Sequence, residues 1–193
     1  MAGSPLWAPV LSFPPALLLQ AQGIRGAIFD VDGVLTDGRI YLSEHGEDFK
    51  AFSTLDGHGL KLLLQGGITP LVITGRDSPA VRRRVADLGL DHAIYGAHDK
   101  LAAATELLAR LQLGWPEIAA MGDDWPDLPL LARAAFACAP PQAHAEVRAR
   151  AHHVTAAAAG HGAAREFCDL LLCAAGRYAA LLAGPLTTLD ATP

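Results

Sequence analysis

The sequence predicts an α/β domain with a Rossmann-like parallel sheet and helices on both faces. Two observations predict this fold class. Short apolar segments that fit buried strands alternate along the chain with segments whose leucines recur at helical spacing. Apolar residues make up 51% of the 193 residues and charged residues only 18%, so the chain can bury one sizeable core.

Strands are expected where apolar residues run without interruption and then meet glycine, proline or a polar group. In chain order the expected strands are 26–30, 69–73, 92–95, 118–121 and 135–139. Between the first two, segments 39–42 and 48–52 alternate apolar and polar residues on either side of Ser-Glu-His-Gly-Glu. This pattern predicts a β-hairpin inserted after the first strand.

Helices are expected where apolar residues recur every three or four positions. In chain order the expected helices are 16–22, 57–66, 78–88, 100–111, 126–133, 143–150 and 163–182. Ser78 followed by Pro79 is a typical helix start, and Gly66-Gly67 is a typical helix end. The last helix is predicted from its alanine content, which does not define where that helix ends.

These elements form one domain over residues 24–182, between an N-terminal arm with a short helix (1–23) and a flexible C-terminal tail (183–193). The first charge is Arg25 and the Pro14-Pro15 pair interrupts the apolar start, so neither a secretory signal nor a membrane span is predicted. Three cysteines without a C-x-x-C pair favour reduced thiols and a cytoplasmic location. A formal charge of −5 gives no reason to expect nucleic acid as a partner.

Polar side chains stand where three of the predicted strands end. Asp30 closes the first strand, Thr74 follows the second, and Asp123 follows the strand at 118–121. Ligands of open parallel sheets bind outside the carboxyl ends of the strands. These three residues are therefore expected to meet in one crevice.

Two clusters of carboxylates surround that crevice. Asp30 and Asp32 are two positions apart, and Asp123, Asp124 and Asp127 lie within five positions. Carboxylates so close together resist joint ionisation unless a cation lies between them, and oxygen ligands of this kind suit Mg²⁺. Either cluster alone fits an acidic turn or an aspartate-rich helix start, but the two together favour a metal site.

Lys100 and Thr74 supply groups that an anionic substrate would need. Lys100 begins a predicted helix, where the helix dipole gives a cation no advantage, and Thr74 precedes the small Gly75. The bland alternatives are a solvated surface lysine and a simple turn. A phosphate dianion near Asp30 meets a repulsion of about 4 kcal/mol per pair of unit charges at ~4 Å, which a lysine and a divalent cation can offset.

The order and spacing of these residues resemble the haloacid-dehalogenase-like phosphatases. The shared pattern is D-x-D-G at residues 30–33, a threonine at a strand end, a lysine, and G-D-D-x-x-D at residues 122–127. It extends over residues 26–139. Each piece alone is common, whereas the combination is specific. The resemblance implies the fold of that superfamily and Mg²⁺-dependent hydrolysis of phosphate monoesters.

The resemblance also implies a role for each residue. Asp30 attacks phosphorus and becomes an aspartyl-phosphate, and Asp32 protonates the departing alcohol and then activates water. Asp30, the backbone carbonyl of Asp32, and Asp123 hold the metal. Thr74 and Lys100 hold the phosphoryl oxygens. The residues that orient the site without touching the metal are Asp124 and Asp127.

A closer resemblance is to the 3-deoxy-D-manno-octulosonate 8-phosphate phosphatases of lipopolysaccharide biosynthesis. It is carried by D-V-D-G-V-L-T-D-G, G-E-D-F-K-A-F-S-T-L-D-G-H-G, I-T-G-R and G-H-G-A-A-R-E, and covers about residues 20–182. Those enzymes are cytoplasmic homotetramers without a cap domain. The short gaps between motifs leave no room for a cap here, so the resemblance implies that the hairpin and a neighbouring subunit supply the substrate wall.

The resemblance implies a substrate-binding set around Asp32 and Lys100. Its further members are Ser53, Thr54, Leu55, Asp56, Gly57, Lys61, Arg76 and Arg84. Leu55, Lys61 and His161 depart from the family pattern, because arginine is common at these positions. Fewer arginines weaken the expectation of this carboxylated sugar and leave the phosphoryl chemistry unchanged.

Two alternatives stay open. One is phosphatase action on a nine-carbon sugar acid 9-phosphate, although Arg76 stands where those enzymes have glutamate. The other is a non-catalytic oligomerisation module of the same fold. The intact Asp30, Asp32, Lys100 and Asp123 argue against such a module.

Overall fold

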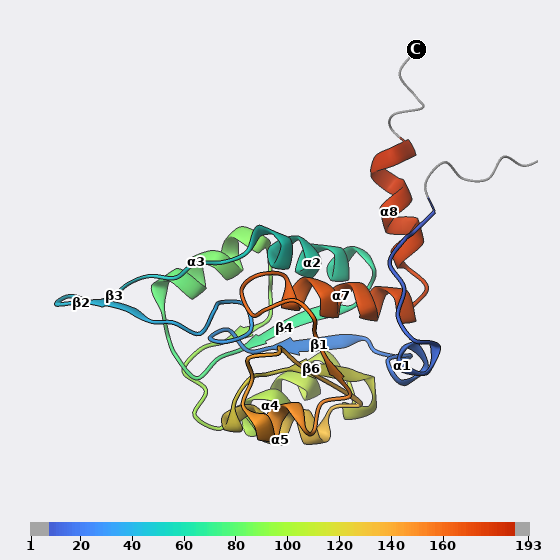
Figure 1. Ribbon diagram of the computed structural model, residues 1–193. Coiled ribbons are helices and arrows are strands. Elements are labelled where there is room, and N and C mark those ends of the chain that lie inside the picture. Colours follow the sequence, from blue (N-terminus) through green and yellow to red (C-terminus); the bar gives the residue numbers. More distant parts are fainter. Residues whose placement is uncertain (1–7, 188–193) are drawn as a thin grey trace, which may run out of the picture.

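The computed structural model describes residues 8–187, in which a sheet lies between two layers of helices (Figure 1). Six strands form this sheet in the order β5-β4-β1-β6-β7-β8, and neighbouring strands pair in parallel. The predicted α/β fold is confirmed. In chain order the strands are β1 (Gly26–Phe29), β4 (Thr69–Ile73), β5 (Ala93–Ile94), β6 (Ile118–Met121), β7 (Phe136–Ala139) and β8 (His153–Val154).

Three helices cover one face of the sheet: α2 (Thr54–Gln65), α3 (Pro79–Leu88) and α7 (Ala163–Ala174) (Figure 1). The short α1 (Pro15–Gln20) packs against α7. Between these helices and the sheet, the rings of Phe29, Phe136 and Phe167 are fully buried, and the Phe29 and Phe167 centroids lie 5.5 Å apart. Loss of one such ring typically costs about 3–5 kcal/mol, so this cluster is a major part of the core.

The opposite face is covered by α4 (Lys100–Leu111), α5 (Leu128–Arg133) and α6 (Ala145–Arg148). Leu71 and Ile73 of the sheet pack there against Leu107 and Leu108 of α4. Because helices cover both faces, every residue of β1, β6 and β7 is buried. This double burial explains why these strands are continuous apolar runs in the sequence.

The predicted hairpin is present, and both of its strands are shifted from the bounds 39–42 and 48–52. β2 (Tyr41–Ser43) and β3 (Gly46–Phe49) form a separate antiparallel ribbon that projects from the body (Figure 1). The strand expected at 48–52 begins at Gly46 because the turn needs only Glu44 and His45. Gly46 adopts a φ of +109°, a backbone conformation that glycine tolerates and that makes this short turn possible.

The start of α2 differs from the prediction. This helix begins at Thr54 instead of residue 57 because the Ser53 hydroxyl accepts hydrogen bonds from the backbone N–H groups of Leu55 and Asp56. The segment 53–57, predicted to line a substrate pocket, therefore forms the N-cap and first turn of a helix.

The prediction of one long helix at 163–182 is wrong. The segment contains two helices, α7 and α8 (Tyr178–Thr187), which are separated at Gly176, whose φ is +67°. α8 therefore includes the first residues of the tail predicted at 183–193. The rest of that tail, and residues 1–7 of the predicted N-terminal arm, lie outside the described residues.

Strand β8 was not predicted, because it has only two residues, one of them the polar His153. No separate cap domain interrupts residues 26–139. Among residues 8–187 no single helix has the length and hydropathy of a membrane span; the pair α7 and α8, bent by 109°, meets that test only when taken together.

Candidate active site

The carboxyl ends of three adjacent strands lie at one edge of the sheet. Asp30 follows β1, Thr74 follows β4 on one side of it, and Asp123 follows β6 on the other. These residues line one cavity of about 400 Å³. The other residues of its lining are Asp32, Gly75, Arg76, Ala97, His98, Lys100, Asp124, Pro126 and Asp127. The structure therefore brings together all the residues predicted to carry the phosphoryl chemistry.

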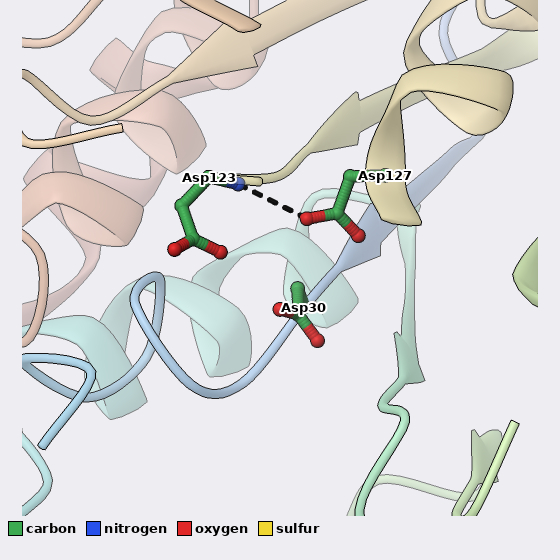
Figure 2. A group of neighbouring side chains, drawn as sticks. All are labelled: Asp30, Asp123 and Asp127. Carbon is green, nitrogen blue, oxygen red and sulfur yellow. Dashed lines mark hydrogen bonds between the residues drawn. The ribbon is translucent and has the colours of Figure 1, made fainter. Parts of the chain in front are cut away.

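Three carboxylates gather at this edge of the sheet (Figure 2). Asp30, Asp123 and Asp127 can each offer an oxygen such that these oxygens all lie within 4.8 Å of one another. Both oxygens of Asp127 are already occupied, since one accepts from Lys100 at 2.7 Å and the other from the backbone N–H of Asp123 at 3.1 Å. Asp127 is thus held in place by these hydrogen bonds, whereas Asp30 and Asp123 keep oxygens that a cation could bind.

Lys100 is the buried cation of the cluster. Its side chain is 5% exposed, and its ammonium lies 2.8 Å from Asp30 and 2.7 Å from Asp127. Burial disfavours the ammonium form, but the two carboxylates outweigh burial and raise the pKa of Lys100. Lys100 is therefore charged, and three carboxylates face a single positive charge.

This excess of negative charge affects the pKa values of the carboxyl groups. Burial, together with the charge of Asp127, raises the pKa of Asp30 to about 6. Burial, together with the charges of Asp30 and Asp127, raises the pKa of Asp123 to about 8. Without a further cation one of these carboxyl groups holds a proton at neutral pH. The oxygen donors and their missing positive charge therefore fit a hard divalent cation.

Close approach of the two strand-end loops requires a glycine. Gly33 has a φ of +88°, and a Cβ built at this position would overlap the carboxylate of Asp123. The loop itself is tight, because the Val31 carbonyl accepts hydrogen bonds from the N–H groups of Leu35 and Thr36. The glycine of D-x-D-G thus lets Asp123 reach the neighbourhood of Asp30.

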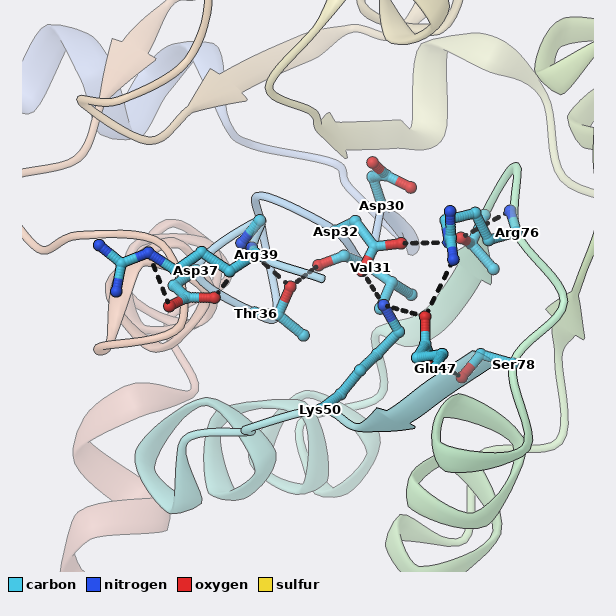
Figure 3. Close-up of polar contacts among 12 residues, drawn as sticks. Asp30, Val31, Asp32, Thr36, Asp37, Arg39, Glu47, Lys50, Arg76 and Ser78 are labelled. Carbon is cyan, nitrogen blue, oxygen red and sulfur yellow. Dashed lines mark hydrogen bonds and ion pairs between the residues drawn. The ribbon is translucent and has the colours of Figure 1, made fainter. Parts of the chain in front are cut away.

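Asp32, which lines the cavity, belongs to a network that the sequence analysis missed (Figure 3). Its carboxylate lies 2.5 Å from the ammonium of Lys50, a buried residue that follows β3. Glu47 and Ser78 extend the network. Lys50 and Glu47 both belong to the motif G-E-D-F-K-A-F, and their presence in that motif was the available signal.

The remaining predicted substrate residues lie apart from this cavity, with the exception of Arg76. Arg84 donates a hydrogen bond to the Ser53 carbonyl, and Lys61 and Leu55 are exposed on α2. The residues that surround a separate narrow crevice beside Arg84 include Ser53, Asp56 and Gly57. Thr54 begins α2 and is exposed. Their role in substrate binding stays a prediction.

The Asp56 carboxylate binds backbone groups of a neighbouring helix instead of lining the cavity. It is 2% exposed, and its carboxylate accepts hydrogen bonds from the backbone N–H groups of Gly162 and Arg165 at the start of α7. Burial raises the pKa of Asp56, and these hydrogen bonds oppose that shift. Asp56 therefore ties α2 to α7.

His161 lies beside a second cavity, with Asp37 and Arg39.

Comparisons with known proteins agree with this geometry. A family model described as haloacid dehalogenase-like hydrolase matches residues 95–167. The chain is 42% identical over 163 residues to 3-deoxy-D-manno-octulosonate 8-phosphate phosphatase KdsC of Salmonella typhimurium, which covers 84% of this chain and 87% of that protein.

Solved structures show the same likeness. A probable yrbi family phosphatase from Pseudomonas syringae has a TM-score of 0.85 and 45% identity, covering 91% of this chain and 98% of that one. The 3-deoxy-D-manno-octulosonate 8-phosphate phosphatase of Moraxella catarrhalis, solved with a magnesium ion, a phosphate ion and a KDO molecule, has a TM-score of 0.84 and 39% identity, covering 87% and 97%. The chain belongs to the 3-deoxy-D-manno-octulosonate 8-phosphate phosphatase family of haloacid-dehalogenase-like hydrolases.

Proposed function

We propose that this chain hydrolyses 3-deoxy-D-manno-octulosonate 8-phosphate to the free sugar acid and inorganic phosphate. One observation carries the proposal: Asp30 lies in the strand-end cavity between Lys100 and Asp123, within a chain of this family. In this proposal the cation is Mg²⁺. Asp30, Asp123 and the backbone carbonyl of Asp32 would hold it, and when bound it would neutralise charge on the phosphoryl group.

Asp30 and Asp32 divide the chemistry in two steps. A carboxylate oxygen of Asp30 attacks phosphorus, the bond from phosphorus to the sugar oxygen breaks, and that oxygen takes the proton of the Asp32 carboxyl group. The Asp32 carboxylate then removes a proton from water, whose oxygen attacks phosphorus and releases phosphate from Asp30. Lys100 and Thr74 hold the phosphoryl oxygens during both steps.

Phosphate release from a panel of substrates tests this function. The panel contains the eight-carbon and nine-carbon sugar acid phosphates and p-nitrophenyl phosphate, each assayed with Mg²⁺ and with a chelator. We expect kcat/KM for the eight-carbon substrate to exceed that for the nine-carbon substrate by about 10-fold or more. A preference for the nine-carbon substrate would identify the first alternative. Absence of phosphate release from every substrate would identify the non-catalytic module.

The projecting hairpin supports a homotetramer as part of the proposal. Its apolar side chains are exposed, with Leu42 at 69% and Phe49 at 55%, and Phe49 stacks on Tyr41 with ring centroids 4.5 Å apart. Exposed apolar groups gathered on one projecting ribbon are typical of a protein–protein contact. Neighbouring subunits would meet through this ribbon and complete the wall of the open cavity.

A charged substitution on the hairpin tests the tetramer. We expect Leu42→Glu to convert the assembly to a smaller species, because a buried unpaired carboxylate at a subunit contact is costly. Light scattering coupled to size exclusion would measure the mass, with Leu19→Glu, an exposed leucine on α1, as the control. An unchanged mass for Leu42→Glu, or a monomeric parent protein, would remove the hairpin contact from the proposal.

A further inference from the structure

Lys50 is a buried cation for which the phosphoryl chemistry assigns no task. Its side chain is 0% exposed, less than the 5% of Lys100. A buried ammonium group is retained in a protein only where carboxylates or hydrogen bonds compensate for its lost hydration. Lys50 lies outside the lining of the cavity, and its ammonium group contacts the side chains of Asp32 and Glu47.

Two carboxylates compensate Lys50 (Figure 3). Its ammonium lies 2.5 Å from Oδ1 of Asp32 and 3.2 Å from Oε2 of Glu47. Both carboxylates are mostly buried, with side chains 19% and 13% exposed. Solvent screening between these groups is therefore weaker than at a surface ion pair.

The two oxygens of Asp32 are in different environments. Oδ1 is occupied by Lys50, whereas the nearest guanidinium nitrogen to Oδ2 in an ion pair is Nε of Arg76 at 3.8 Å, beyond hydrogen-bonding distance. Oδ2 is thus the oxygen of Asp32 that accepts no hydrogen bond from residues 8–187. Lys50 determines which oxygen of Asp32 remains available.

Glu47 is itself fixed from two sides. Its Oε1 accepts a hydrogen bond from the Ser78 hydroxyl at 2.5 Å, and its Oε2 accepts one from Arg76 at 3.0 Å. Ser78 occupies the N-cap position of α3, yet its side chain makes no capping hydrogen bond there. The hydroxyl that would ordinarily cap the helix is used to hold Glu47.

We propose that Lys50, held by Glu47, is a positioning residue that orients the Asp32 carboxyl group for proton transfer to the leaving oxygen. This inference rests on the proposed phosphatase function. In the first step the O–H bond at Oδ2 of Asp32 breaks, an O–H bond to the departing alcohol forms, and the bond from phosphorus to that oxygen breaks. Lys50 keeps Oδ1 out of this transfer.

A purely structural ion pair that anchors the hairpin makes a different prediction. If Lys50 only anchors the hairpin, its loss lowers the rate for all substrates by the same factor. If Lys50 orients the proton donor, its loss matters most for leaving groups that need a proton. The dependence of kcat/KM on the leaving group therefore separates the two roles.

The test uses a series of substituted phenyl phosphates with the full chain and Mg²⁺, comparing the parent, Lys50→Met and Glu47→Gln. We expect Lys50→Met to lower kcat/KM for phenyl phosphate by about 10-fold or more, and for p-nitrophenyl phosphate by less than about 3-fold. The plot of log kcat/KM against leaving-group pKa becomes steeper. Glu47→Gln shifts the slope in the same direction by a smaller amount.

The matched controls are Asp48→Asn, the exposed neighbour of Glu47 on β3, and Arg83→Met, an exposed cation on α3. Both should keep the parent slope. Should Lys50→Met not fold, as judged by its melting curve, the slope of Glu47→Gln decides. A parallel loss for all leaving groups in the folded variants would overturn the positioning role. A parent protein that releases no phosphate would instead overturn the proposed function.

Discussion

Replacing Asp30 by asparagine lowers kcat by at least about 10³-fold, because removal of an enzymatic nucleophile leaves only the contribution of binding and electrostatics. Asparagine keeps the size of the side chain and can still accept a hydrogen bond from Lys100. It supplies no nucleophilic oxygen and no negative charge for a cation. We expect phosphate release to fall to the background rate for the sugar acid phosphate and for p-nitrophenyl phosphate alike.

The covalent intermediate gives a second measurement of the same prediction. Rapid acid quench of the parent with labelled substrate should trap a phosphorylated protein that hydroxylamine cleaves, and Asp30→Asn should show none. The control is Asp37→Asn, whose carboxylate follows in the same loop and accepts from the N–H of Arg39 outside the cavity. Full activity or an unchanged acyl-phosphate in Asp30→Asn would refute the nucleophile assignment.

Replacing Asp123 by asparagine should stabilise the metal-free protein while it removes the cation site. The pKa of Asp123 is raised to about 8 by burial and by Asp30 and Asp127, well above that of an unfolded aspartate. Between about pH 4 and 8 the folded state therefore binds more protons at this group than the unfolded state does. The free energy of unfolding consequently falls as the pH rises through this window.

Asparagine carries no titratable proton, so in the variant the free energy of unfolding no longer falls with pH through this group. We expect Asp123→Asn to gain on the order of 2 kcal/mol at pH 8 in a chelator, a conservative value that allows for partial exposure. For a domain of this size the melting temperature then rises by about 4–8 °C. The gain should shrink as the pH approaches 5, because Asp123 of the parent is then protonated and neutral.

The response to Mg²⁺ distinguishes this stabilisation from a general effect. Mg²⁺ should raise the melting temperature of the parent, since it binds only the folded state, and leave that of Asp123→Asn unchanged. Asp91→Asn, at an exposed aspartate before β5, is the control and should keep the parent response. An Asp123→Asn protein that is less stable than the parent in chelator at pH 8 would contradict the charge imbalance.

The sequence was sufficient for the central strands and for the residues at their ends. β1, β6 and β7 are buried on both faces, and strands buried in this way consist of uninterrupted apolar residues. The convergence of Asp30, Thr74 and Asp123 then follows from the direction of parallel strands, without knowledge of any side-chain contact.

The features that escaped prediction depend on contacts between distant segments. Lys50 pairs with Asp32 across 18 positions, and Ser78 reaches Glu47 across 31, so no local periodicity marks them. Asp56 was placed in the substrate set by resemblance, but its carboxylate is engaged with α7, more than 100 positions away. The end of the helix at Gly176 was not predicted, because alanine favours helix on both sides of this glycine.

Gly33 has no functional group, yet the contact between its backbone and the carboxylate of Asp123 leaves room for a hydrogen atom alone. Any missense codon at this position introduces a carbon where that carboxylate lies, so the Asp123 side chain or one of the two loops must move. A residue without chemistry of its own is thus expected to accept no other amino acid unless that carboxylate is displaced.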